Sequence, residues 1–348
     1  MTTGIEATAR PGSRGPAATH PVVEWLLEPS HPVVRRLALL GLEGRPSTDS
    51  EMAALTASLT NDPWVAPLLA GRFREGVEPP TFVHAYAKWT GAHWRLFALA
   101  ELGLDRTVPG ARRSLEGAVE QELEWLLSPG RRRRLRPIDG RTRNCSSQEG
   151  AGVWAAVRLG FAAEPRLRPL VERLVEIQWP DGGWNCDVRP AASHSSFNES
   201  WMPLRALVAY RAADATLEDP VEGLDEAIER AVEFFLRHRV VESERTGGLA
   251  NERVALLRWP PYWHYGLLPG LRTLADAGRL DDPRARAGLE RLRERRAADG
   301  RWYPEGRYWR GPGAAAGAGV ELVRWGRDGE AKMLTLHAMQ LLRAAGLD

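Results

Sequence analysis

Apolar residues recur along this chain with the period of an α-helix, in two alternating kinds of segment. The first kind is amphipathic, with charged side chains on one face and an apolar stripe on the other. In residues 165–178 this stripe consists of Leu167, Leu170, Val171, Leu174 and Val175. The second kind is richer in small and apolar residues on every face, which is typical of buried helices. Alternation with a period of two is not evident, so the pattern predicts an all-α protein.

The two kinds of segment alternate six times, with a repeat of about 60 residues. We expect the amphipathic segments to be outer helices, at 20–28, 48–59, 111–127, 165–178, 223–239 and 282–297. We expect the apolar segments to be inner helices, at 31–42, 91–103, 147–160, 198–212, 262–278 and 330–345. Several inner segments end in glycine, the residue preferred just after a helix. Residues 1–19, rich in Gly, Pro, Ala and Thr, are expected to form a flexible leader to a single domain at 20–348.

Turn motifs repeat as well. Gln178-Trp179 is followed by Asp181-Gly-Gly-Trp184, and related turns end in Trp64 and Trp302. Ser195 or Ser196 followed by Glu199 has the spacing of a capping box at the start of the next inner helix.

These turns resemble the glutamine-tryptophan repeat of the squalene cyclase and prenyltransferase superfamily, and the resemblance covers nearly the whole chain. It implies an (α/α)6 toroid of six inner and six outer helices, with a ligand cavity at the N-terminal ends of the inner helices. In such a fold Trp184 is expected to clamp neighbouring repeats. The Asp-rich motifs of terpene cyclases are absent from the sequence.

The resemblance implies a terpenoid-cyclase-like or prenyltransferase-like enzyme that acts on an isoprenoid or similarly apolar substrate. Two alternatives stay open, because one fold supports many functions. One is a non-catalytic toroid that binds a ligand or another protein. The other is a sugar-active α/α barrel, which also uses aromatic platforms and paired carboxylates.

The composition limits the kinds of molecule that this protein is expected to bind. With 47 Lys and Arg against 45 Asp and Glu, the net charge of +2 does not favour nucleic acid. The sequence shows no signal-peptide core and no apolar run long enough to span a membrane, so a cytoplasmic location is expected. The oligomeric state is left open.

The reactive side chains gather where loops enter the inner helices. Cys145, Cys186 and one histidine, either His194 or His264, are expected to bind zinc, with Asp187 as the reserve ligand. Thiolates and imidazole are preferred zinc ligands, and prenyltransferases bind zinc at such junctions. Packing thiols and a capping histidine are the alternative. The expected acid–base residues are Glu149, Glu199, His264 and His93.

The remaining residues at these junctions are expected to line the substrate cavity. They are Lys88, Trp89, Trp94, Gln148, Asp187, Asn198, Tyr262, Trp263 and Glu330. Aromatic faces stabilise cations and bind apolar groups, which is why these residues suggest a cavity. For the glutamates, the alternative is that a carboxylate in the first helical turn complements the helix dipole. The arginine run that begins at Arg131 is expected to be a solvated loop.

Overall fold

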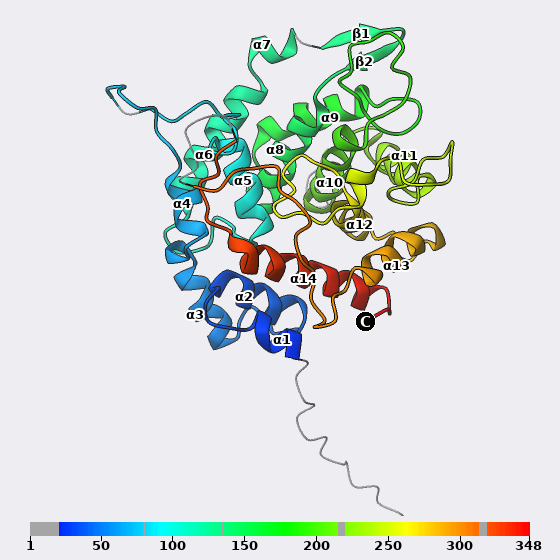
Figure 1. The fold of residues 1–348 in the computed structure, drawn as a ribbon. Coiled ribbons are helices and arrows are strands. Elements are labelled where there is room, and N and C mark those ends of the chain that lie inside the picture. Colours follow the sequence, from blue (N-terminus) through cyan, green and yellow to red (C-terminus); the bar gives the residue numbers. More distant parts are fainter. Residues whose placement is uncertain (1–20, 80, 134, 215–219, 313–318) are drawn as a thin grey trace, which may run out of the picture.

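The computed structural model describes residues 21–79, 81–133, 135–214, 220–312 and 319–348 (Figure 1). The described part is mainly helical, and its one sheet is a two-stranded hairpin. The all-α prediction is therefore confirmed. The expected leader, residues 1–19, lies outside the described residues.

A helix is present in each of the predicted segments. The outer helices are α1 (Pro21–Leu26), α3 (Ser50–Ser58), α6 (Arg112–Leu126), α9 (Arg168–Glu176), α11 (Leu224–Arg237) and α13 (Arg286–Glu294). The inner helices are α2 (Pro32–Gly41), α5 (Ala92–Glu101), α8 (Ser146–Arg158), α10 (Phe197–Asp214), α12 (Leu267–Asp276) and α14 (Gly326–Ala344).

The connecting loops contain short elements that the periodicity did not predict. They are α4 (Val65–Ala70), α7 (Pro129–Arg132), the antiparallel strands β1 (Arg136–Ile138) and β2 (Arg141–Arg143), and the 3-10 turns η1 (Leu59–Asn61), η2 (Pro165–Leu167), η3 (Glu252–Ala255) and η4 (Pro283–Ala285). Elements of three to six residues are too short to produce a recognisable hydrophobic period.

Two inner helices begin at positions other than those predicted. Helix α12 begins at Leu267, because Tyr262 has a left-handed φ of 49° and the extended Gly266 caps the helix. The aromatic residues at 262–265 therefore belong to the preceding loop. Helix α14 begins at Gly326, so Glu330 lies in its second turn rather than at its start.

The inner helices pack on one another in the order α5, α8, α10, α12, α14, α2. Helices α8 and α10 have the most extensive interface. There the backbones approach so closely that a Cβ at Gly150 would lie 2.4 Å from the backbone nitrogen of Pro203. Every residue of α5 is buried, which explains why its segment is rich in apolar residues.

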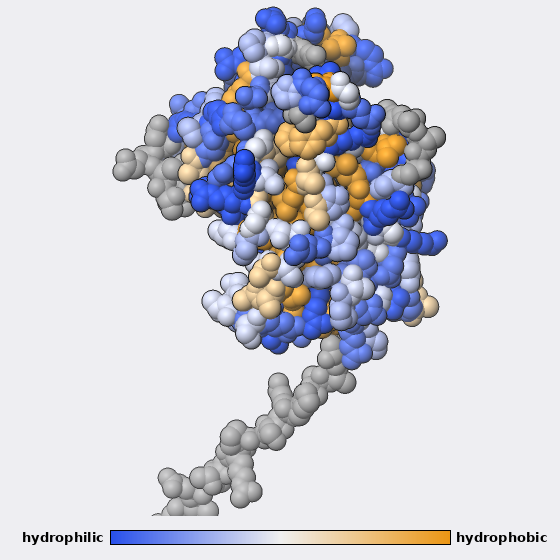
Figure 2. Space-filling view, turned by 90° about the vertical axis from the view of Figure 1, so that its left-hand side faces the viewer, coloured by the Kyte–Doolittle hydropathy of each residue, from blue (hydrophilic) through white to orange (hydrophobic). Residues whose placement is uncertain are grey.

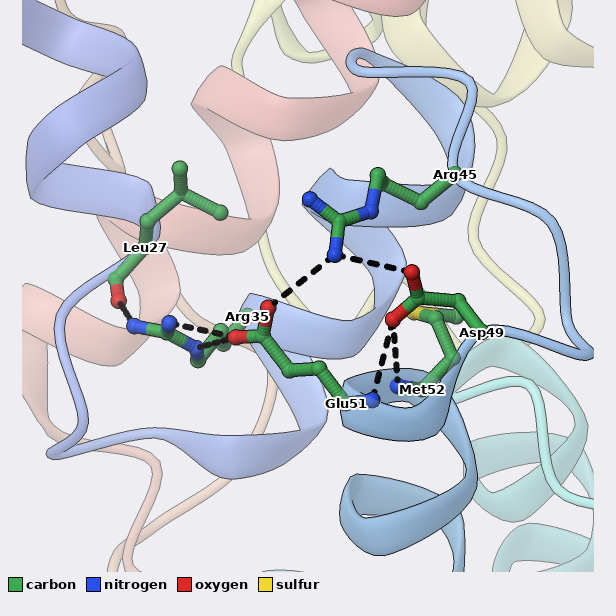
Figure 3. A network of polar contacts seen from close by, with 6 residues as sticks. All are labelled: Leu27, Arg35, Arg45, Asp49, Glu51 and Met52. Atoms are coloured by element: carbon green, nitrogen blue, oxygen red, sulfur yellow. Dashed lines mark hydrogen bonds and ion pairs between the residues drawn. The ribbon is translucent and has the colours of Figure 1, made fainter.

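Polar contacts join the outer and inner helices at the start of the chain (Figure 3). Arg35 of α2 donates to the Leu27 carbonyl after α1 and to the Glu51 carboxylate of α3, with its Nε 3.0 Å from Glu51 Oε1. Asp49 caps α3 by accepting the backbone N–H groups of Glu51 and Met52. Three successive helices are thereby held in one arrangement.

The tryptophan turns form equivalent contacts in different repeats. Trp184 is buried; its indole N–H donates to the Leu174 carbonyl at 2.9 Å, and its backbone N–H donates to the hydroxyl of Ser200. Trp302 does the same with the Leu292 carbonyl, at 2.7 Å, and the Thr335 hydroxyl. Each tryptophan thus links an outer helix to the following inner helix.

Charged and polar side chains predominate on the face that Figure 2 shows, with apolar side chains in small patches. Within the residues that the structure describes, none of the helices has the length and apolar character needed to cross a membrane.

Candidate metal centre

Cys145, Cys186 and Glu199 form a group, here called the Cys-Cys-Glu group, whose ligand atoms all lie within 4.8 Å of one another. Both cysteines are free thiols and half-buried, whereas Glu199 is buried. The Cys186 thiol donates to Glu199 Oε1 at 3.3 Å. The structure therefore brings together both predicted cysteine ligands and one predicted catalytic glutamate.

Two inner helices and one loop position these side chains. Cys145 is the residue before α8, and Glu199 lies in the first turn of α10. The backbone N–H of Ser147 donates to Glu199 Oε2 at 3.0 Å, which orients the carboxylate across the helix interface. The backbone N–H of Asn144 donates to the Asn185 carbonyl at 3.1 Å, which brings the Cys186 loop against the start of α8.

The expected capping box does not form, because Glu199 is used elsewhere. Its carboxylate binds Ser147 and Cys186, whereas the Ser196 N–H donates to the Trp184 carbonyl. Ser195 instead donates to Asp181, through its N–H at 2.7 Å and its hydroxyl at 2.5 Å. These bonds close the loop between α9 and α10.

The protonation properties of the group follow from its geometry. The hydrogen bond with the Cys186 thiol lowers the pKa of Cys145, and the same bond raises the pKa of Cys186. Burial raises the pKa of Glu199. The protonation of the two thiols is therefore linked.

A basic pocket of about 350 Å³ adjoins the two cysteines. Its lining residues are Arg131, Arg136, Arg143, Asn144, Cys145, Gln148, Cys186 and Val188. Arg143 is 1% exposed and stacks on Trp179, and its Nε and Nη1 groups have no hydrogen-bond partner. Buried guanidinium N–H groups without acceptors favour the binding of an anion.

Arg131 is buried rather than solvated, which corrects the expectation at this position, whereas Arg132 and Arg133 are exposed as expected. It donates to Gln148 and stacks on Trp125, with its Nη2 3.6 Å from Glu149 Oε1. Glu149 also accepts hydrogen bonds from Arg173 at 2.8 Å and Asn144 at 3.2 Å. Because arginines balance its charge, the Glu149 carboxylate is suited to holding Arg131 in place rather than to acid–base chemistry.

His93 does not line this pocket and pairs with Glu122. Its Nδ1 is 2.7 Å from Glu122 Oε1, and both side chains are buried. Tyr86 packs between His93 and Gln148, and burial raises its pKa to about 12. Tyr86 thus remains a hydroxyl at neutral pH, hydrogen-bonded to Gln148.

A second cluster surrounds Lys88, which is exposed. Its ammonium group lies 5.1 Å from the ring of Trp89, 6.0 Å from Trp94 and 5.3 Å from Trp263. His264 stacks on Tyr308, and burial lowers the pKa of His264 to about 3. This histidine is therefore neutral at physiological pH.

Trp89, Trp94 and Tyr262 are buried and pack on one another instead of facing an open space. The Tyr262 hydroxyl donates to Glu321. This part of the expected cavity lining is core.

The other predicted site residues lie outside the Cys-Cys-Glu group. The exposed His194 offers its backbone carbonyl to Asn185, Asp187 pairs with Arg189, and Asn198 accepts the Tyr265 N–H at 2.8 Å. The Glu330 carboxylate is buried and accepts two hydrogen bonds from Arg307 Nε, at 2.7 and 2.9 Å.

The donor set fits zinc. Two thiolates and one carboxylate are zinc ligands, and three protein ligands with an open fourth position are typical of catalytic rather than structural zinc. The Ser147 N–H orients the carboxylate in the way that outer partners orient metal ligands.

Sequence reasoning missed the arginines of this pocket. Arg143 precedes Cys145 by two positions, and this spacing was the available signal for it. Arg173 lies on a predicted outer helix, where a charged residue is ordinary, so nothing in the sequence marked it as a partner of Glu149. Comparison with known proteins finds no matching family model and no similar curated protein.

Proposed function

We propose that this chain is an α/α toroid enzyme of the terpenoid-cyclase and prenyltransferase type, with a zinc ion bound by the Cys-Cys-Glu group. Its substrate is an isoprenoid or similarly apolar molecule that carries an anionic group. The observation that carries the proposal is the convergence of Cys145, Cys186 and Glu199 beside a pocket of buried arginines.

The packing order of the inner helices supports the closed toroid. Helix α14 packs on both α12 and α2, and Arg36 of α2 donates to the Gly103 carbonyl after α5 at 3.1 Å. Contacts of this kind join the first inner helix to the second and to the last, as ring closure requires.

The zinc ion, when bound, would supply a Lewis acid that stabilises negative charge on the substrate or activates a bound nucleophile. The protein supplies the remaining interactions. Arg143 offers its unpartnered Nε and Nη1 groups to the anionic group, and Glu149 holds Arg131, which also lines the pocket.

Packed aromatic side chains lie between this pocket and the Lys88 cluster. Tyr86 is hydrogen-bonded to Gln148 at one end and lies 4.8 Å from the ring of Trp94 at the other. Trp94 in turn lies beneath Lys88. A reducing cytoplasm suits the centre, because metal binding requires both cysteines as free thiols.

The sugar-active alternative has less support. A glycosidase needs one carboxyl that holds a proton and a second one nearby. Glu149 and Glu330 are each paired with arginine, Glu199 is bonded to Cys186, and the buried Glu321 is bonded to Tyr262. The non-catalytic toroid is distinguished from an enzyme by the turnover assay described below.

Metal analysis of the purified full chain tests the proposal. We expect about one zinc per chain by mass spectrometry of the elements, lost in Cys145→Ser and reduced in Glu199→Gln. His194→Ala is the matched control and should retain zinc, since His194 lies outside the group. Zinc that is absent, or equally present in Cys145→Ser, would contradict the metal centre.

The same variants test catalysis. Zinc-loaded protein should release pyrophosphate from prenyl diphosphates, and Cys145→Ser should lower the rate by at least about 100-fold, the scale of a lost charge-stabilising group. Arg143→Gln should mainly raise KM. A zinc-bound protein that turns over none of these substrates would favour the non-catalytic alternative.

A further inference from the structure

A second pocket of about 350 Å³ lies at the other end of the inner helices. All six contribute to it through their C-terminal halves, among them Leu40 of α2, Arg158 of α8 and Arg272 of α12. Arg158 is thirteen residues after Cys145, which corresponds to about 20 Å along α8. The pocket is therefore separate from the Cys-Cys-Glu group.

The floor of this pocket is a buried network of charges. Arg205 donates to Glu101 at 2.7 Å and to Asp276 at 2.6 Å, and Arg272 donates to the other oxygen of Glu101. Burial alone would raise the pKa of Glu101, but the two arginines lower it to about 2. The network is thus fully charged at neutral pH and rigidly held.

Three polar groups on the walls have no partner within the described residues. The Arg158 guanidinium is exposed, the Gln340 amide is half-buried, and neither makes a hydrogen bond or ion pair there. His337 is 4% exposed, and its Nδ1 has no hydrogen-bond partner. Burial lowers the pKa of His337 well below its ordinary value, so the ring is a neutral hydrogen-bonding group.

Apolar side chains complete the lining of the pocket. They are Leu37 and Leu40 of α2 and Val208, Ala209 and Ala212 of α10. Leu40 is 44% exposed. Apolar side chains together with a few polar groups are the usual lining of a small-molecule site, and the volume lies within the range of such sites.

We infer that this pocket binds a small carboxylic acid with an apolar tail. The lining contains three arginines, Arg158, Arg205 and Arg272, and two carboxylates, Glu101 and Asp276, which leaves one positive charge. One excess charge beside a neutral histidine matches a monoanion better than a phosphate dianion. The carboxylate pairs with Arg158 and accepts from Gln340, and the tail lies along Leu37, Leu40 and Val208.

Calorimetric titration of the full chain with octanoate, below its micelle concentration, tests this inference. We expect saturable binding of octanoate and at least tenfold weaker binding of octanamide, its neutral equivalent. Arg158→Gln should weaken octanoate binding about tenfold. Arg113→Gln, which removes an equally exposed charge from α6, should leave binding unchanged.

A second variant tests the location. Ala212 is exposed at the pocket wall, so Ala212→Trp should fold normally, keep its zinc content and lose octanoate binding through occlusion. The inference is overturned if octanoate does not bind, if octanamide binds equally well, or if Arg158→Gln and Ala212→Trp bind octanoate as the unaltered protein does.

Discussion

Glu321 is a buried glutamate whose hydrogen bonds come from neutral donors. The Tyr262 hydroxyl and the backbone N–H groups of Leu322 and Val323 donate to it. Glu101, Glu149 and Glu330, in contrast, pair with arginines. Burial raises the pKa of Glu321 to about 7.

This raised pKa predicts a loss of stability as the pH rises. The folded protein keeps the Glu321 proton up to about pH 7, whereas the unfolded chain releases it near 4.5. The free energy of unfolding should therefore be highest below pH 4.5, so far as this group is concerned, and fall by roughly 3 kcal/mol as the pH rises to 7.

Denaturant titrations at several pH values measure this effect. Glu321→Gln keeps the shape of the side chain and cannot ionise, so its free energy of unfolding should not fall in this way. The difference in free energy of unfolding between the variant and the unaltered protein gives the contribution of Glu321. Parallel pH profiles of the variant and the unaltered protein would refute the assignment.

At the scale of helices and turns, the turns that contain Trp184 and Trp302 hold an outer helix against the following inner helix. Gln178 connects this turn to the next outer helix, because its amide donates to the Gly182 carbonyl in the turn and to the Ala227 carbonyl of α11. The glutamine-tryptophan pattern therefore has a structural explanation in this chain.

Trp184→Ala should lower the free energy of unfolding by about 3–5 kcal/mol, because it empties a buried site and removes a hydrogen bond. Trp302→Ala should cost a similar amount, since its contacts are equivalent. Trp184→Phe keeps most of the packing and should lose only about 1–2 kcal/mol. Denaturant unfolding checks all three variants. An unchanged unfolding midpoint for Trp184→Ala would show that the turn does not stabilise the packing of the two helices.

At the scale of the whole molecule, side-chain contacts join the first helices of the described chain to the last one. Lys332 of α14 is fully buried and donates to the Trp25 carbonyl of α1, with its Nζ 2.9 Å from a Glu28 carboxylate oxygen. Arg343 donates to the Leu42 carbonyl after α2 at 2.9 Å. These bonds connect residues about 300 positions apart.

A closed arrangement predicts that the terminal helices are as protected as the central ones. Amide hydrogen exchange in α2 and α14 should be as slow as in α8, whereas the ends of an open array would exchange faster. Lys332→Met should accelerate exchange in α1, because the Trp25 carbonyl loses its donor. Arg343→Gln, at a more exposed contact, serves as the milder control. Fast exchange of α2 in the unaltered protein would contradict closure.

The sequence by itself determined where the helices lie. The segment predicted at 111–127 is a helix at Arg112–Leu126, and the one predicted at 223–239 is a helix at Leu224–Arg237. A helix is defined by contacts within four residues, so the apolar period and the end signals are sufficient. The sequence also indicated that Cys145 and Cys186 lie at successive helix junctions, where the structure brings them together.

Only the tertiary structure decided what surrounds the thiols. Glu199 rather than His194 joins them, because the bonds between Asp181 and Ser195 set the path of the loop and leave His194 exposed. The burial of Arg131 depends likewise on a pairing with Glu149 across distant segments. Such contacts have no local period or spacing, because they depend on how separate helices and loops pack, and they exist only in the folded chain.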